Sequence, residues 1–149
     1  GHAGMAGGQA IDLASVGVAL NEDQLRQMHR LKTGALLEAS VMMGAACGVA
    51  SAQALKSLQA YGRALGLAFQ VVDDILDVTA DSATLGKTAG KDAAADKPTY
   101  VSLMGLAPAQ HLAEQLYAES LAALDASGLN TTATAALRAL AAQVVQRKN

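Results

Sequence analysis

The sequence is poor in aromatic residues, which make up 3% of its 149 residues and include no Trp. A β-sandwich core depends on Val, Ile, Tyr, Phe and Trp, so this scarcity argues against one. Hydrophobic residues still make up 52% of the chain, mostly as Ala, Leu, Val and Met. Three of these four are good helix formers. We therefore expect one all-α domain over residues 1–149, built as a closely packed helical bundle.

Thiols and imidazoles are equally scarce. The single cysteine, Cys47, excludes an internal disulfide framework and a thiolate zinc site. The three histidines are far apart in the sequence and do not suggest a metal site. The net charge of −2 provides no basic surface for nucleic acid or an anionic membrane. These absences favour a protein of the reducing cytoplasm that binds no nucleic acid.

No segment has the length and composition of a membrane span. The longest uncharged stretch without proline, Ala39 to Leu55, is shorter than the ~20 residues that a span requires and is rich in Ala, Gly and Ser. The first residues, Gly1 to Met5, lack the charged and apolar regions of a signal peptide. This stretch therefore favours buried helical structure over a membrane helix, and we expect a cytoplasmic location.

Helical periodicity predicts a short helix, two long ones, a polar loop and three further helices. Acids after Asn21 suit the first turn of a helix that Asn21 caps. The loop is long for a compact domain, which indicates a functional segment. The expected ranges are Gly4 to Ala14, Asn21 to Gly48 with an irregularity at Lys32-Thr33-Gly34, Ser51 to Val78, the loop Thr79 to Lys97, helices starting at Pro98 and Pro108, the latter ending near Asp125, and one capped by Asn130 or Thr131.

An acidic stripe near the end of the second long helix is the most informative feature. Positions three and four apart share a helix face, so Gly66, Gln70, Asp73 or Asp74, and Asp77 line one side of an otherwise apolar helix. Like charges one turn apart repel each other, and a divalent cation reverses that effect. Mg²⁺ takes one or two carboxylates together with substrate phosphates. The stripe therefore indicates a Mg²⁺ site facing a wet cavity, and a solvated acidic helix end is the alternative.

Basic residues lie where a phosphate ligand would need them. Lys87, Lys91 and Lys97 follow the acidic stripe on the polar loop, and Lys32 precedes Thr33 in the first long helix. Any one of them alone is more often a solvated surface lysine. Their combination with the acids favours a site for a diphosphate and its metal ion.

These residues resemble the trans-isoprenyl diphosphate synthases, a family of all-α enzymes with a large central cavity. The segment Phe69 to Asp77 resembles the family's second aspartate-rich motif, and further matches follow the family's order over essentially the whole chain. These matches are Gly7 to Leu13, His29 to Leu36, Gly86 to Tyr100, and the ending Val145 to Lys148, which is similar to that of bacterial farnesyl diphosphate synthases.

The resemblance implies roles for individual residues and a C-terminal part of the isoprenoid synthase fold. It places Asp73, Asp74 and Asp77 on Mg²⁺ bridging to an allylic diphosphate, whose oxygens Lys32, Lys87 and Lys97 would hold. Thr33 and Gln70 would direct their dipoles at the allylic cation. The implied reaction joins dimethylallyl or geranyl diphosphate to isopentenyl diphosphate, giving farnesyl diphosphate. Lys91 has no counterpart in the family pattern.

The chain also departs from the family. It has no second D-D-x-x-D and no Arg-Arg pair, which in the family complete the metal site and the isopentenyl diphosphate site. We therefore expect this chain to correspond to the C-terminal half of such an enzyme and to be inactive alone. An uncovered cavity wall would leave apolar surface exposed, which favours a homo-oligomer or pairing with another chain.

Other interpretations stay open at this point. A non-catalytic small subunit of a prenyl synthase would be a helical partner, although it has no evident reason to keep the acids and lysines. A class I terpene cyclase shares the metal chemistry, but its second metal motif is not seen after Asp77. A longer-chain synthase and a generic helical bundle are the remaining alternatives, since the sequence does not determine product length.

Overall fold

The computed structural model describes residues 1–79 and 97–147, and within them the chain is helical without any strand. This confirms the all-α prediction. No helix in these residues has the length and apolar character needed to cross a membrane. The helices are α1 (Met5–Ala14), α2 (Glu22–His29), the π-helical turn η1 (Arg30–Gly34), α3 (Ala35–Ala46), α4 (Ala52–Thr79), α7 (Tyr100–Met104), α8 (Leu106–Asp125) and α9 (Thr131–Gln146).

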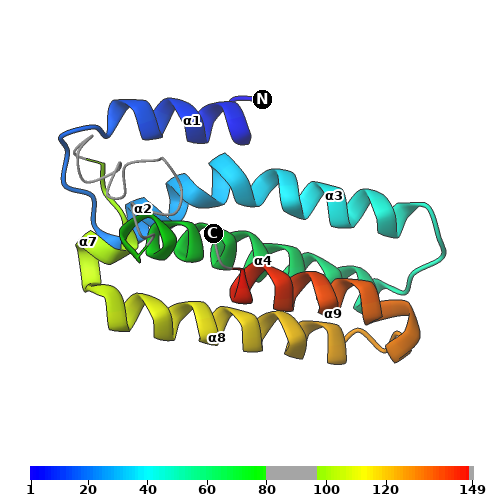
Figure 1. The fold of residues 1–149 in the computed structure, drawn as a ribbon. Helices are drawn as coiled ribbons and strands as arrows, with labels where there is room; N and C mark the ends of the chain where they lie inside the picture. The colour runs from blue at the N-terminus through cyan, green and yellow to red at the C-terminus, as the bar shows by residue number, and fades with distance from the viewer. Residues whose placement is uncertain (80–96, 148–149) are drawn as a thin grey trace.

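Helix α4 is the central element of the bundle. It packs against α3 and α8, and also against α9, α7, α2 and η1. Figure 1 shows α3, α4 and α8 as long, roughly aligned helices, with α1 beside the η1 end of the bundle. A helix surrounded in this way must be apolar on most sides. The polar residues that α4 does carry are therefore informative about function.

Local side-chain chemistry accounts for where the helices begin. The Asn21 side chain accepts the Gln24 backbone N–H at 2.9 Å, and the Gln24 side chain accepts the Asn21 backbone N–H at 3.0 Å. The two hydrogen bonds form a capping box. Asn130 accepts the Ala133 N–H at 2.7 Å in the same way. Both caps confirm the prediction.

The two proline-based starts were misplaced by two residues. The helix expected at Pro98 begins at Tyr100, because Thr99 forms the N-cap by accepting the Ser102 N–H at 3.0 Å. Helix α8 begins at Leu106 rather than at Pro108. Pro108 fits within its first turn, where the backbone N–H groups lack intrahelical partners and a missing N–H costs nothing.

The irregularity predicted at Lys32-Thr33-Gly34 is the π-helical turn η1, which joins α2 to α3. π-helical turns widen the backbone locally and often occur at functional sites. Here the turn packs against α1 on one side and α4 on the other. It places Lys32 and Thr33 between those two helices.

Close contact between η1 and α4 depends on glycine. A Cβ atom built on Gly66 would lie 2.8 Å from the Gly34 Cα atom, and one on Gly8 would lie 2.1 Å from the Lys32 backbone nitrogen. Neither distance leaves room for a methyl group, and in both cases the obstructing atom belongs to the backbone. Glycine at these positions therefore sets how closely α4 and α1 approach the η1 turn.

Two apolar clusters hold the bundle together. One joins α2, α4, α7 and α8 around Leu25, Val71 and Tyr100, all fully buried. The other joins α4, α8 and α9 around Tyr61 and Leu124. The Tyr61 hydroxyl donates to the Leu137 carbonyl at 2.7 Å, which satisfies the one polar atom of that buried ring.

We predict that Gly66→Ala destabilises the protein by about 1–3 kcal/mol, because the added methyl group must push α4 away from η1. The matched control is Gly44→Ala, since a Cβ at this exposed position in α3 meets no atom within 4 Å. That substitution should be neutral or stabilise by up to about 1 kcal/mol through helix propensity. Denaturant unfolding measures both, and equal effects would contradict the close-contact argument.

Candidate functional site

A cavity of about 150 Å³ lies where α1, the α2–η1 junction, α4 and the segment before α7 meet. Five residues that the sequence analysis assigned to a site line it: Lys32, Gln70, Asp73, Asp74 and Lys97. The remaining lining residues are Asp12, His29, Pro98 and Thr99. Residues far apart in the sequence thus converge on one polar cavity, although the predicted site residues Thr33 and Asp77 do not line it.

Gln70 is the central hydrogen-bond acceptor of the site. Its Oε1 atom accepts the Thr33 hydroxyl at 2.8 Å and lies 3.1 Å from His29 Nδ1. Two donors on one amide oxygen fix the orientation of the Gln70 side chain. Because Gln70 is buried on α4, this arrangement ties the η1 turn to the acidic stripe.

His29 serves this arrangement as a neutral imidazole. Its pKa is lowered from 6.5 to about 4, mainly by burial. The Gln70 hydrogen bond opposes this shift, and the charge of nearby Lys32 adds to it. A neutral ring that donates to Gln70 must carry its proton on Nδ1. Nε2 is then an acceptor, and it is buried without a hydrogen-bond partner among the described residues. The ring stacks against Tyr100 with centroids 5.7 Å apart.

Asp12 positions the lysines of the site. Its buried Oδ2 atom lies 2.9 Å from Lys32 Nζ and 3.8 Å from Lys97 Nζ. Asp12 and Gly8 are the buried residues of α1, one turn apart on the face that packs against η1. One carboxylate therefore holds two of the lysines predicted to bind phosphate, and both ammonium groups gather at the cavity.

Asp73 is paired with an arginine from the far end of the chain. Arg147, directly after α9, places Nη2 3.1 Å from Asp73 Oδ1 and 3.0 Å from the Phe69 carbonyl oxygen. Its guanidinium group lies over the Phe69 ring, 4.1 Å from the centroid, as a cation–π contact. The Asp73 side chain is 59% exposed, so its carboxylate remains accessible from the solvent side.

Asp74 has a different environment from its neighbour. It is buried, and its Oδ2 atom accepts the Tyr100 backbone N–H at 2.7 Å. This hydrogen bond joins α4 to the start of α7 and so holds the segment that carries Lys97. The adjacent acids of the motif therefore face different surroundings: one is exposed at the cavity and the other is buried against α7.

The donor set suits a hard cation that also binds a ligand. Asp73 and Asp77 are one helical turn apart on α4 and offer carboxylate oxygens, which Mg²⁺ prefers. Within residues 1–79 and 97–147, no three His, Cys, Asp or Glu side chains form a ready-made metal cage. Mg²⁺ commonly takes its other ligands from water and substrate phosphate. Lys87, the remaining predicted phosphate ligand, lies outside the described residues.

Three residues of the site were not assigned a role from the sequence. Asp12 and Arg147 belong to segments noted only for their similarity to the family, and His29 was set aside because the histidines are scattered. An acid four residues after Gly8, and therefore on the same face of a glycine-interrupted helix, is the signal that could have indicated Asp12. Nothing local distinguishes Arg147, whose partners lie 74 and 78 residues away.

The family model that matches this chain, and the two known relatives compared with it, are of prenyl synthases. The family model for polyprenyl synthetase matches residues 2–136. The chain is 49% identical to a probable farnesyl diphosphate synthase of Bradyrhizobium diazoefficiens, over 98% of this chain and 43% of that protein. It is 45% identical to the farnesyl diphosphate synthase of Escherichia coli, over 99% of this chain and 50% of that protein. The chain therefore spans half or less of these relatives.

A solved structure also matches the fold. It is the geranyltransferase of Helicobacter pylori, complexed with magnesium and isoprenyl diphosphate. The TM-score is 0.71 with 38% sequence identity, over 95% of this chain and 44% of that one. The helical arrangement is thus shared with a protein about twice as long that binds both components in its own structure.

We predict that His29 makes stability depend on pH. The folded protein protonates His29 only near pH 4, whereas an unfolded chain does so near its ordinary value of 6.5. The unfolded state then binds more protons, so stability should fall by up to about 3 kcal/mol as the pH drops from 6.5 to 4. Above pH 6.5 this contribution is fully present.

Unfolding measured between pH 6.5 and 4 gives the change in stability, and ¹⁵N NMR of the imidazole gives the protonation state of His29. The spectrum at pH 6 should show a neutral ring protonated on Nδ1. His29→Gln should lose the acid-side slope, while the matched control His111→Gln, at an exposed position of α8, should retain it. A charged imidazole at pH 6 would contradict the lowered pKa of His29, since burial would then not keep the ring neutral.

Proposed function

We propose that this chain, which belongs to the polyprenyl synthetase family, supplies one wall of a prenyltransferase active site. The reaction would join an allylic diphosphate to isopentenyl diphosphate, with farnesyl diphosphate as the product. The two relatives described above carry the farnesyl diphosphate synthase name, which supports that product over longer ones. The chain would bind the allylic diphosphate and its metal ion.

One observation supports this proposal above all: basic side chains gather at one part of the cavity at Gln70, and an exposed acid lies at another. Lys32 and Lys97 meet at the buried Asp12, and the exposed Asp73 lies on the neighbouring face of α4. Ammonium groups suit the oxygens of a diphosphate, while the carboxylate suits the cation that accompanies it. A purely structural partner would have no use for both sets beside one cavity.

We assign Asp73 and Asp77 as the Mg²⁺ ligands. When bound, Mg²⁺ stabilises the negative charge that develops on the departing diphosphate. Arg147 neutralises Asp73 in the arrangement described here, so it competes with the ion for this carboxylate. The buried Asp74 would contribute indirectly, by holding the Tyr100 backbone and thereby the segment of Lys97.

Lys32, Thr33 and Gln70 would act on the substrate itself. Ionisation breaks the allylic C–O bond and leaves its electron pair on the diphosphate, where the Lys32 ammonium stabilises the charge. The Thr33 hydroxyl donates its hydrogen to Gln70, so its oxygen lone pairs are the negative end that can face the allylic cation. The double bond of isopentenyl diphosphate then attacks the cation, and a proton is lost.

Exposed apolar residues on two helices favour association of this chain with another chain. Leu13 on α1 and both Leu36 and Met43 on α3 are at least 60% exposed. Soluble monomers seldom expose large apolar side chains in numbers. We propose that these helices are covered in a homo-oligomer or by a chain that supplies the rest of the active site.

The metal-binding part of the proposal predicts Mg²⁺-dependent binding of inorganic diphosphate to this chain, measured by calorimetry. Lys32→Gln should weaken it by about tenfold or more, as expected for a lost charge-assisted hydrogen bond. Asp73→Asn should remove the Mg²⁺ dependence. Arg147→Gln should strengthen the Mg²⁺-dependent binding, because Arg147 no longer competes for Asp73. The matched control is Asp23→Asn, an exposed acid of α2 away from the cavity. Equal binding with and without Mg²⁺ would contradict the assigned site.

The catalytic part predicts that the 149-residue chain forms no elongated product from geranyl and isopentenyl diphosphates with Mg²⁺. The reason is that the sequence carries one D-D-x-x-D motif and no Arg-Arg pair for isopentenyl diphosphate. Radiolabelled isopentenyl diphosphate and extraction of the products provide the assay. Detectable farnesyl diphosphate would show that these groups are not required. Loss of diphosphate binding as well would favour the non-catalytic small subunit instead.

A further inference from the structure

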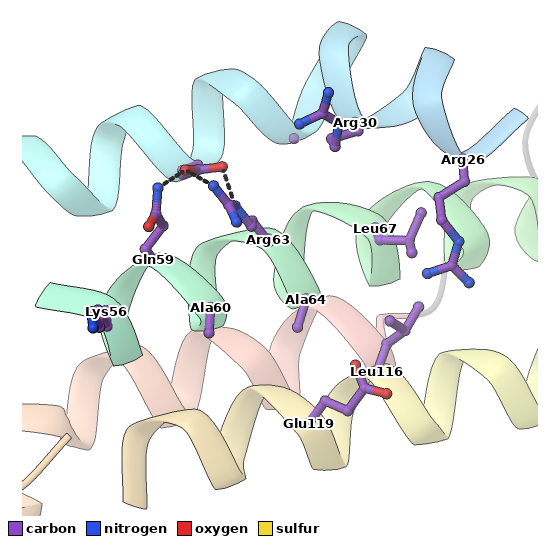
Figure 2. A pocket seen from close by; sticks show the side chains of 12 residues that line it. Arg26, Arg30, Lys56, Gln59, Ala60, Arg63, Ala64, Leu67, Leu116 and Glu119 are labelled. Atoms are coloured by element: carbon purple, nitrogen blue, oxygen red, sulfur yellow. Dashed lines mark hydrogen bonds and ion pairs between the residues drawn. The ribbon is translucent and has the colours of Figure 1, made fainter. Parts of the chain in front are cut away.

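A second cavity, of about 350 Å³, lies between the continuous segment α2–η1–α3, α4 and α8, and we call it the lateral groove. None of its lining residues lines the cavity at Gln70. Its volume is in the range of about 300–1,000 Å³ that is usual for small-molecule sites. Figure 2 shows it bounded above by the helices of Arg26 and Arg30, with α4 behind and α8 below.

The floor of the lateral groove is apolar and made mainly by α4. Ala60, Ala64 and Leu67 lie three or four positions apart on one face of that helix, and Leu116 joins them from α8. Because alanine side chains are short, the groove is deeper at these two positions than it would be with longer side chains. No aromatic residue lines the groove within the described part of the chain, so it offers no stacking surface for a nucleobase.

The rim of the lateral groove carries more positive than negative charge. Its cations are Arg26, Arg30, Lys56 and Arg63, and its acids are Glu38 and Glu119. Glu38 is already neutralised, because Arg63 Nε and Nη2 lie 3.0 and 3.2 Å from its two carboxylate oxygens. Gln59 adds a hydrogen bond at 2.6 Å. Figure 2 shows this cluster on the wall of the groove.

The other cations have no comparable partner. Arg26 pairs at 3.3 Å with Glu22, an exposed acid of its own helix that does not line the groove. Arg30 donates from Nε to the neutral Gln27 side chain at 3.0 Å, and neither Arg30 nor Lys56 forms an ion pair with any described residue. Glu119 is the acid that remains to oppose them. The unneutralised charge of the rim is therefore positive, above an apolar floor.

We propose that the lateral groove binds an anionic amphiphile, with a phosphate monoester or carboxylate head at Arg26 and Arg30 and an alkyl tail over Ala60, Ala64 and Leu67. Guanidinium groups match the geometry of both heads. From Leu67 to Lys56 the α4 wall extends about 16 Å, at 1.5 Å per residue, which accommodates a medium-length alkyl chain. A neutral lipid has no anionic group for the arginines to bind, and the arginines would repel a cation.

This inference is independent of the proposed prenyltransferase function, because the two cavities share no residue. The experiment therefore omits metal: a chelator removes Mg²⁺ from the buffer, and decyl phosphate is titrated into the full chain. Methyl NMR signals of Leu67 and Leu116 report on the groove floor, and the methyl signal of Thr99, which lines the cavity at Gln70, reports on the other cavity. Saturable shifts of the two leucines with an unchanged Thr99 signal are the expected result.

Decanoate, inorganic phosphate and decyl maltoside separate the contributions of head and tail. Decanoate binding as tightly as decyl phosphate would assign the site to any anionic head, and weaker binding would assign it to phosphate; both outcomes support the groove. Inorganic phosphate should bind at least about tenfold more weakly than decyl phosphate, because it has no tail to bury. Equal binding of uncharged decyl maltoside would overturn the proposal, since the rim would then play no part.

Substitutions at exposed positions test the groove without disturbing the core. Arg30→Gln should weaken decyl phosphate binding by about tenfold, and Glu119→Gln should tighten it by about threefold. Ala60→Phe should abolish it by filling the floor. The matched control is Ala136→Phe on α9, a helix that contributes no lining residue. Unchanged binding in Ala60→Phe, or shifts at Thr99 instead of the leucines, would overturn the assignment.

Discussion

The close approach of α4 to the η1 turn is the contact on which the rest of the site depends. Gly66 and Gly34 bring the two backbones so near that a methyl group would not fit between them. That proximity lets Gln70 accept hydrogen bonds from Thr33 and from His29. Since Gln70 is one turn after Gly66 on the same face, close helix packing and the polar network are parts of one arrangement.

Basic and acidic side chains of the site form ion pairs within the protein. Asp12 holds Lys32 and Lys97, and Arg147 holds Asp73, each at the cavity surface. Under the proposed function, an incoming diphosphate with its cation would offer the same two kinds of charge. The ligand would therefore replace internal ion pairs and would not meet bare charges, which limits the electrostatic cost of keeping the empty site folded.

Much of the fold could be predicted from the sequence because helix signals are local. The caps at Asn21 and Asn130 and the break at Lys32-Thr33-Gly34 each depend on neighbouring residues, and all were confirmed. The proline-based helix starts were wrong by two residues, since Thr99 capped the helix that Pro98 was expected to begin. The metal and phosphate ligands assigned from the acidic stripe and the lysines remain predictions, although most of them converge on one cavity.

The sequence by itself determined the all-α class, the α4 stripe of Gln70 and Asp73, and the family to which the chain belongs, because periodicity and motif spacing are properties of neighbouring residues. Only the tertiary structure decided which groups meet. Arg147 reaches Asp73 across 74 positions, and His29 reaches Gln70 across 41. The neutral state of His29 arises from burial by other helices. Such partnerships depend on how helices pack in space, which no local pattern encodes.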